Sequence, residues 1–142
     1  KKLQNDTTAL LQNAQQRFPT LRIAYLSGRI YGGWAVTSLN PEPYAHEGNL
    51  VVRWMIRDQM SGSPELNHDP AKGPVKAPLL LWGSYLWADG TIPRKSDGLV
   101  WERQDLAADG THPSQSGRRK VAEMLLKFFE SDPLARTWFV KH

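Results

Sequence analysis

Two stretches decide the fold: Leu21-Arg22-Ile23-Ala24-Tyr25-Leu26 and Pro78-Leu79-Leu80-Leu81-Trp82-Gly83. Both are short and mostly apolar, which is typical of strands in a parallel sheet that is covered on both faces. Residues 46–60, which lie between them, predict a helix that is apolar over much of its circumference and therefore largely buried. A strand, a helix and a second strand form a βαβ crossover, so we expect an α/β protein.

Further helices are predicted on both sides of this unit. The first covers about residues 7–17, where Asp6 or Thr7 can cap it and Pro19 ends it. The last covers about residues 115–130, with Ser114 as a plausible cap. Its apolar residues predict a buried stripe made of Val121, Met124, Leu125, Phe128 and Phe129.

Long segments separate these elements. Residues 27–44 and 84–113 each follow a strand and carry glycines and aromatic residues, so we expect ordered, functional loops. Residues 61–78 are rich in Gly, Pro, Ser and Asn and are the best candidate for a flexible excursion. Two strands make a thin sheet, and we expect further sheet to come from another segment or a second chain.

Composition sets the outer limits on function. The 142 residues are predicted to form one α/β domain, with 40% hydrophobic residues and a net charge of +4. The absence of cysteine excludes disulfides and thiolate metal sites, and no apolar run approaches the roughly 20 residues of a membrane span. The cluster Arg118-Arg119-Lys120 is interpreted as a solvated helix face, so neither a nucleic acid nor a membrane is an expected partner.

The run Asp109-Gly110-Thr111-His112-Pro113-Ser114 carries the chemistry. A carboxylate three residues before an imidazole can turn back onto one ring nitrogen and fix its tautomer. The other nitrogen then faces outward as a general base. In an open α/β sheet, such groups gather where the strands end, and the loops after both predicted strands share that edge.

This run, followed by a Ser-x-Ser-Gly helix start and an apolar helix, resembles the C-terminal Asp-x-x-His block of the SGNH (GDSL-type) serine hydrolases. The order helix, strand, helix, strand, helix also resembles the C-terminal part of that family's three-layer α/β/α, flavodoxin-like fold. The resemblance implies an esterase in which His112 is the general base and Asp109 orients it. Its substrate would be a carboxylic ester or an acylated carbohydrate, and no cofactor or metal is implied.

The family's nucleophile does not appear in this chain. There is no Gly-Asp-Ser block and no Gly-x-Ser-x-Gly elbow. Ser27 and Ser84 each follow a strand, but a serine there more often caps a turn; Ser96 and Ser114 are weaker candidates. We therefore expect the chain to be the C-terminal portion of a longer hydrolase, with the serine and the oxyanion groups on an N-terminal part.

Several other residues have two interpretations. Tyr31, Trp34, Tyr85 and Trp87 could form a substrate platform at the mouth of the site, or they could pack in the core. Asn67-His68-Asp69 could contribute to a metal site, but a solvated loop explains it better, and no metal is predicted. Glu42, His46 and Glu47 are interpreted as first-turn residues of a helix.

A second hypothesis, from another class, is a non-catalytic carbohydrate-binding or interaction module that uses the aromatic loops. A third is that the thin sheet pairs with a second chain. The sequence does not give the cellular compartment, although the resemblance leans towards a secreted or periplasmic bacterial protein.

Overall fold

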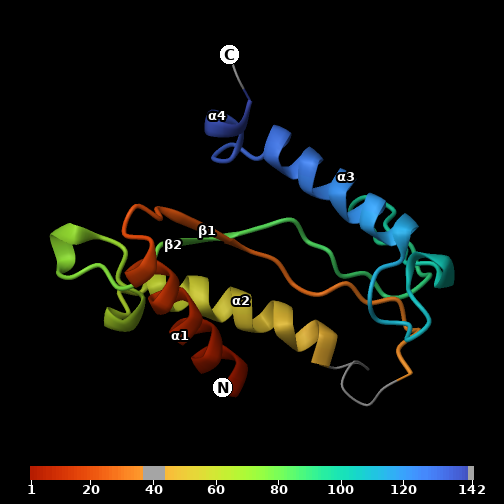
Figure 1. Cartoon of the computed structure of the whole chain (residues 1–142), viewed down its shortest axis with the longest axis horizontal. Helices are drawn as coiled ribbons and strands as arrows, with labels where there is room; N and C mark the ends of the chain where they lie inside the picture. The colour runs from red at the N-terminus through yellow and green to blue at the C-terminus, as the bar shows by residue number, and fades with distance from the viewer. Residues whose placement is uncertain (37–43, 141–142) are drawn as a thin grey trace. The chain divides into compact units, whose positions relative to one another are not determined.

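The computed structural model describes residues 1–36 and 44–140, which form two compact units. The first contains Lys1–Ser27 and Glu47–Gly83, and the second contains Gly28–His46 and Ser84–His142. Figure 1 traces the chain through both units. The expectation of one domain stays a prediction.

The first unit is built around two parallel strands (Figure 1), β1 (Ile23–Leu26) and β2 (Leu79–Trp82). Ile23 pairs with Leu79 at one end and Leu26 with Trp82 at the other. The helix α2 (Tyr44–Met60) lies between them in the chain, so the predicted strand–helix–strand order and the α/β class are confirmed. Within the described residues the sheet has two strands, as the sequence predicts.

The first helix is longer than the sequence predicts. α1 spans Lys2–Arg17, and Asp6 and Thr7 lie inside it instead of capping it. Asp6 forms an ion pair with Lys2 at 2.9 Å, and the Thr7 hydroxyl donates to the Leu3 carbonyl at 2.8 Å. Both polar groups are satisfied within helical turns, which removes their competition with the helix.

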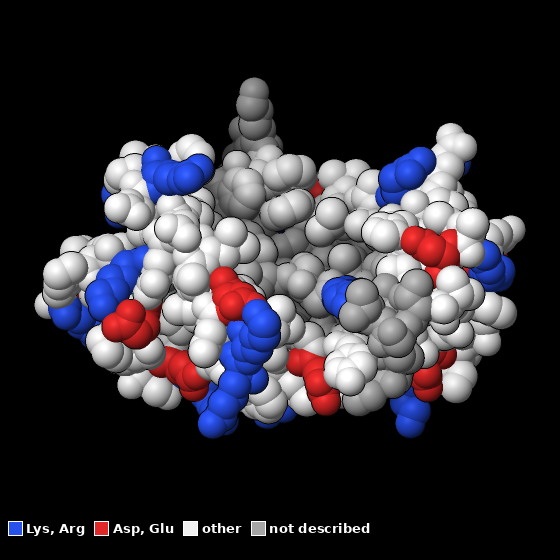
Figure 2. Space-filling view, turned by 60° about the horizontal axis from the view of Figure 1, so that its bottom comes forward, with Lys and Arg blue, Asp and Glu red and all other residues white. Residues whose placement is uncertain are grey.

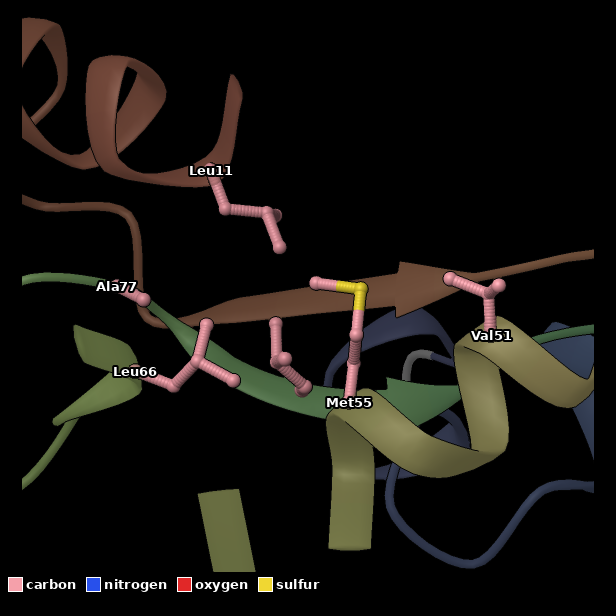
Figure 3. Close-up of a cluster of buried hydrophobic side chains, with 6 residues drawn as sticks. Leu11, Val51, Met55, Leu66 and Ala77 are labelled. Atoms are coloured by element: carbon pink, nitrogen blue, oxygen red, sulfur yellow. The ribbon is translucent and has the colours of Figure 1, made fainter. Parts of the chain in front are cut away.

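The core of the first unit is a small apolar cluster (Figure 3). Leu11 of α1, Met55 of α2 and Leu66 point toward one another, and Val51, Ala77 and Leu80 complete the cluster. The expectation that α2 is largely buried is wrong, because Trp54 is 38% exposed and Met60 84%. A two-stranded sheet covers one side of a helix only, and the opposite side of α2 stays open.

Residues 61–78, expected to be a flexible excursion, contain two short 3₁₀ helices, η1 (Pro64–Leu66) and η2 (Pro70–Lys72). The Asn67 amide donates to the carbonyls of Asp69, Gly73 and Pro74 at 2.9–3.1 Å. The Asn67 backbone carbonyl accepts from the backbone N–H groups of Lys76 and Ala77. The side chain and backbone of one residue, Asn67, therefore connect the two ends of most of this segment.

The second unit contains η3 (Arg103–Asp105), α3 (Gln115–Ser131) and α4 (Arg136–Phe139). Ser114 caps α3 as predicted, accepting from the Gly117 backbone N–H at 3.4 Å. The predicted stripe is half-buried rather than buried, and Gly117 is the buried residue of α3. Within this unit α3 packs against η3 and α4, which are too short to cover a helix of this length.

Candidate functional site

Asp109 and His112 lie at the tip of a tight turn in the second unit. Leu106 and Pro113 form an antiparallel bridge at its base, and the Ala107 N–H donates to the His112 carbonyl at 2.7 Å. The Gly110 N–H closes the turn on the Ala107 carbonyl at 3.0 Å. The three-residue separation of Asp109 and His112 in the sequence is therefore the separation across one closed turn.

The predicted carboxylate–imidazole pair is formed. Asp109 Oδ2 lies 2.5 Å from His112 Nδ1. The other carboxylate oxygen, Oδ1, accepts from the backbone N–H groups of Thr111 and His112 at 2.9 and 3.0 Å. The carboxylate is fixed at three points, so it can hold the proton on Nδ1 and leave Nε2 as the basic nitrogen.

The surroundings of the pair favour ionised Asp109. The hydrogen bond with His112, and then those from the Thr111 and His112 backbone, lower the pKa of Asp109 to about 2. The His112 side chain is 79% exposed, and within the described residues no group hydrogen-bonds to its Nε2. The imidazole is thus oriented on one side and open on the other.

Arg103 holds the chain that leads into this turn. Its guanidinium donates to the carbonyls of Leu106, Ala107 and Ala108 at 2.9–3.1 Å. These are the three residues directly before Asp109. The sequence analysis missed this role, because nothing in the pattern of a single arginine indicates which carbonyls it will bind.

The loop after β1 reaches the same turn. The Val36 N–H donates to the Asp109 carbonyl at 3.2 Å, and the Trp34 indole N–H donates to the Trp101 carbonyl at 3.2 Å. Gly110 has φ +68°, and a Cβ there would overlap the Trp34 carbonyl oxygen. Trp34 is therefore the predicted aromatic residue that the structure brings against the Asp109–His112 turn, and it is 38% exposed.

A buried tryptophan that the sequence did not single out forms the centre of this unit. Trp101 is 0% exposed, and its indole N–H donates to the Leu86 carbonyl at 2.9 Å. Gly32 packs against it so closely that a Cβ would lie 3.1 Å from the Cβ of Trp101. The loops after both strands are thereby fastened around one ring.

A partly buried ion pair joins this centre to α3. Lys120 Nζ bonds Asp105 Oδ2, donates to the Val100 carbonyl at 3.0 Å and lies 5.3 Å from the Trp101 ring. Burial raises the pKa of Asp105, but the hydrogen bonds from Lys120 and the Glu102 backbone outweigh it, so the pKa is lowered overall. The basic cluster on α3, expected to face solvent throughout, thus contributes one lysine to the interior.

The other predicted aromatic residues have neighbours within the second unit. Tyr85 lies under the Arg94 guanidinium, 5.1 Å from ring centre to Cζ, and Trp87 meets His46 edge to face at 5.2 Å. Arg94 also donates to the carbonyls of Tyr85 and Trp87 at 2.8 and 2.6 Å. Tyr31, Tyr85 and Trp87 are half-buried, so packing accounts for part of each ring.

No serine of the second unit, in its described residues, hydrogen-bonds to His112. Ser114 Oγ donates to the Gln104 carbonyl at 2.6 Å and caps α3, while Ser84 is 8% exposed and Ser96 exposed. Ser27 belongs to the first unit, where its Oγ packs against Gly83. The described part of the chain offers an oriented base without an activated serine.

The remaining candidate residues are those considered for a metal site and those at the start of α2. Among the described residues, no three His, Asp or Glu side chains are grouped to hold a metal ion. The Asn67 and Asp69 side chains are used to shape their own loop, and Glu42 lies outside the described residues. Glu47 lies in the first turn of α2, as interpreted.

Surface charge is mixed. On the face shown in Figure 2, basic side chains lie beside acidic ones among the described residues. None of the helices in the described part is both long and apolar enough to span a membrane. The absence of nucleic-acid and membrane partners stays a prediction.

The chain matches no protein-family model, no curated protein and no solved structure. Its function has to be inferred from its own residues.

Proposed function

We propose that this chain supplies the acid/base half of an SGNH-type serine esterase. The observation that carries the proposal is the contact of 2.5 Å between Asp109 Oδ2 and His112 Nδ1, with the rest of the imidazole exposed. A carboxylate held by two backbone N–H groups keeps the imidazole in one tautomer. The three-layer α/β/α fold of that family is part of the same proposal.

In this mechanism, His112 Nε2 removes the proton from a serine hydroxyl as the serine oxygen attacks the ester carbonyl. The imidazolium then protonates the leaving alkoxide, which gives an acyl-enzyme. Water, deprotonated by the same nitrogen, releases the carboxylic acid and restores the serine. Asp109 stays ionised throughout and stabilises the imidazolium.

The serine and the oxyanion donors are proposed to lie outside this sequence. Within the second unit, the described serine hydroxyls cap α3 or make no bond to His112. Trp34 is proposed to contact the acyl or sugar part of the substrate, since its backbone packs against the turn and its side chain is 38% exposed.

Fluorophosphonate labelling tests this proposal. The probe is applied to the product of the reading frame that contains this segment, and the labelled peptide is located by mass spectrometry. We expect one labelled serine outside residues 1–142, with labelling lost in His112→Ala and reduced in Asp109→Asn. His68→Ala is the matched control and should label normally.

Two results would contradict the proposal in different ways. Labelling of Ser27 or Ser84 would place the nucleophile inside the chain. No labelling at all, or labelling that is indifferent to His112, would remove the esterase itself.

A further inference from the structure

The first unit contains a polar pocket that the proposed esterase does not use. Its volume is about 570 Å³, which is in the range of sites for small organic ligands. Its lining includes Leu21 and Arg22, directly before β1, Ala77 and Pro78, directly before β2, and three glutamines of α1. The pocket thus lies where the two strands begin.

The pocket carries one uncompensated positive charge. Glu65 is paired with Lys76 at 2.9 Å and accepts from the Gln12 amide at 3.1 Å. These hydrogen bonds lower the pKa of Glu65, so the pair is fully charged and internally neutral. The Arg22 guanidinium has no hydrogen-bond or ion-pair partner within the described residues. A planar guanidinium of this kind matches a carboxylate through two parallel hydrogen bonds.

Three glutamines supply neutral hydrogen-bonding groups. Gln12, Gln15 and Gln16 follow one another along α1 and all line the pocket. Gln15 is 8% exposed; its amide nitrogen donates to the Pro19 carbonyl at 3.2 Å, and its Oε1 has no hydrogen-bond partner. A buried amide oxygen without a donor is unfavourable. Gln12 and Gln16, which are less buried than Gln15, can hydrogen-bond to ligand hydroxyl groups.

The apolar part of the lining is aliphatic. Leu21, Val75 and the two prolines contribute to it, and no Phe, Tyr or Trp is present among the described lining residues. A nucleobase would have only the His68 imidazole and the Arg22 guanidinium to stack on, without a large aromatic side chain. The lining fits a ligand that is small, hydroxylated and singly negative.

We propose that this pocket binds a hydroxylated organic carboxylate of the uronic acid type. The carboxylate binds the planar Arg22 guanidinium, and the hydroxyl groups exchange hydrogen bonds with Gln12 and Gln16. This binding is non-covalent and does not depend on the esterase proposal.

The test is an NMR titration of the whole chain with D-glucuronate, compared with D-glucose and with acetate. We expect saturable shifts of residues around Arg22 with glucuronate, and affinities weaker by about tenfold or more for the two fragments, since each lacks one set of hydrogen bonds. Arg22→Gln should weaken glucuronate binding by about tenfold. Arg57→Gln removes an arginine of α2 that is outside the pocket and 69% exposed, and it should change nothing.

Each other outcome is decisive. Equal binding of glucose, or binding unaffected by Arg22→Gln, would overturn the role of the carboxylate, and equal binding of acetate would reduce the pocket to a simple anion site. No saturable shift with glucuronate would overturn the proposal. Arg22→Lys keeps the positive charge but loses the planar guanidinium, so it should bind glucuronate with intermediate affinity. This graded result would show that weak binding by Arg22→Gln does not come from misfolding. His112→Ala should bind glucuronate normally, which separates this test from that of the esterase.

Discussion

Each of the two units is stabilised internally by a different kind of contact. The first closes on aliphatic side chains and a methionine, with Met55 at 0% exposure. The second is stabilised by the buried Trp101 side chain, a partly buried ion pair and close backbone contacts at glycines. The first unit should therefore respond to changes in side-chain volume, and the second to changes in backbone conformation and charge.

The largest effect is expected at Gly110. Gly110→Ala places a Cβ on the Trp34 carbonyl and forces a non-glycine residue to φ +68°, so the turn has to open. We expect a loss of about 4 kcal/mol in the free energy of unfolding, measured by urea denaturation. Gly98→Ala is the control: it has φ +74° but nothing within 4 Å, and should cost about 1 kcal/mol. Equal losses would mean that Trp34 does not pack on the turn.

The corresponding change in the first unit is Met55→Ala. It empties a fully buried site in the apolar cluster and should cost about 3 kcal/mol in the same measurement. Met60→Ala, on the same helix but 84% exposed, should be within about 0.5 kcal/mol of the parent chain. A large loss from Met60→Ala would show that the open side of α2 is covered in solution.

A smaller loss is expected when the ion pair of the second unit is broken. Lys120→Ala leaves the Asp105 carboxylate, whose side chain is 4% exposed, without its cation. Because Lys120 is itself 30% exposed, we expect about 2 kcal/mol, less than for a fully buried pair. Lys127→Ala, on an exposed part of α3, is the control. If both variants unfold alike, Asp105 is solvated and the pair contributes nothing.

The regular elements could be predicted from the sequence because their signals are local. Apolar runs before Gly83 and after Pro19 gave the two strands, and Ser114 was identified as a cap from its position before an apolar helix. Burial could not be predicted in the same way. The periodicity of α2 and α3 marks apolar faces, but whether a face is covered depends on how much sheet or helix lies against it.

The candidate site likewise contains local contacts that could be predicted from the sequence and long-range contacts that could not. Asp109 and His112 are three residues apart, so the pair could be predicted from spacing alone. Arg103, Trp101 and Lys120 act through carbonyls and rings up to 20 residues away, and no local pattern identifies such partners. Trp34 contacts the turn although it lies 75 residues before Asp109 in the chain, and nothing in the sequence around Trp34 indicates this contact.

The smallest expected effect is a change in the pKa of Asp109, which depends directly on the hydrogen bonds within the turn. Its pKa of about 2 in the folded chain is below the roughly 3.9 of an unfolded aspartate. With a depressed folded pKa, the contribution of Asp109 to stability is complete above about pH 4 and is lost as the pH falls through about 2. Carbon-detected NMR of the Asp109 carboxyl should show this midpoint.

His112→Ala removes the largest cause of the lowered pKa of Asp109 and should raise the titration midpoint, while the two backbone N–H groups keep it below the unfolded value. His68→Ala should leave it unchanged. A midpoint that does not move in His112→Ala would mean that the imidazole is not held by this carboxylate, and the base proposed for the esterase would lose its orienting partner.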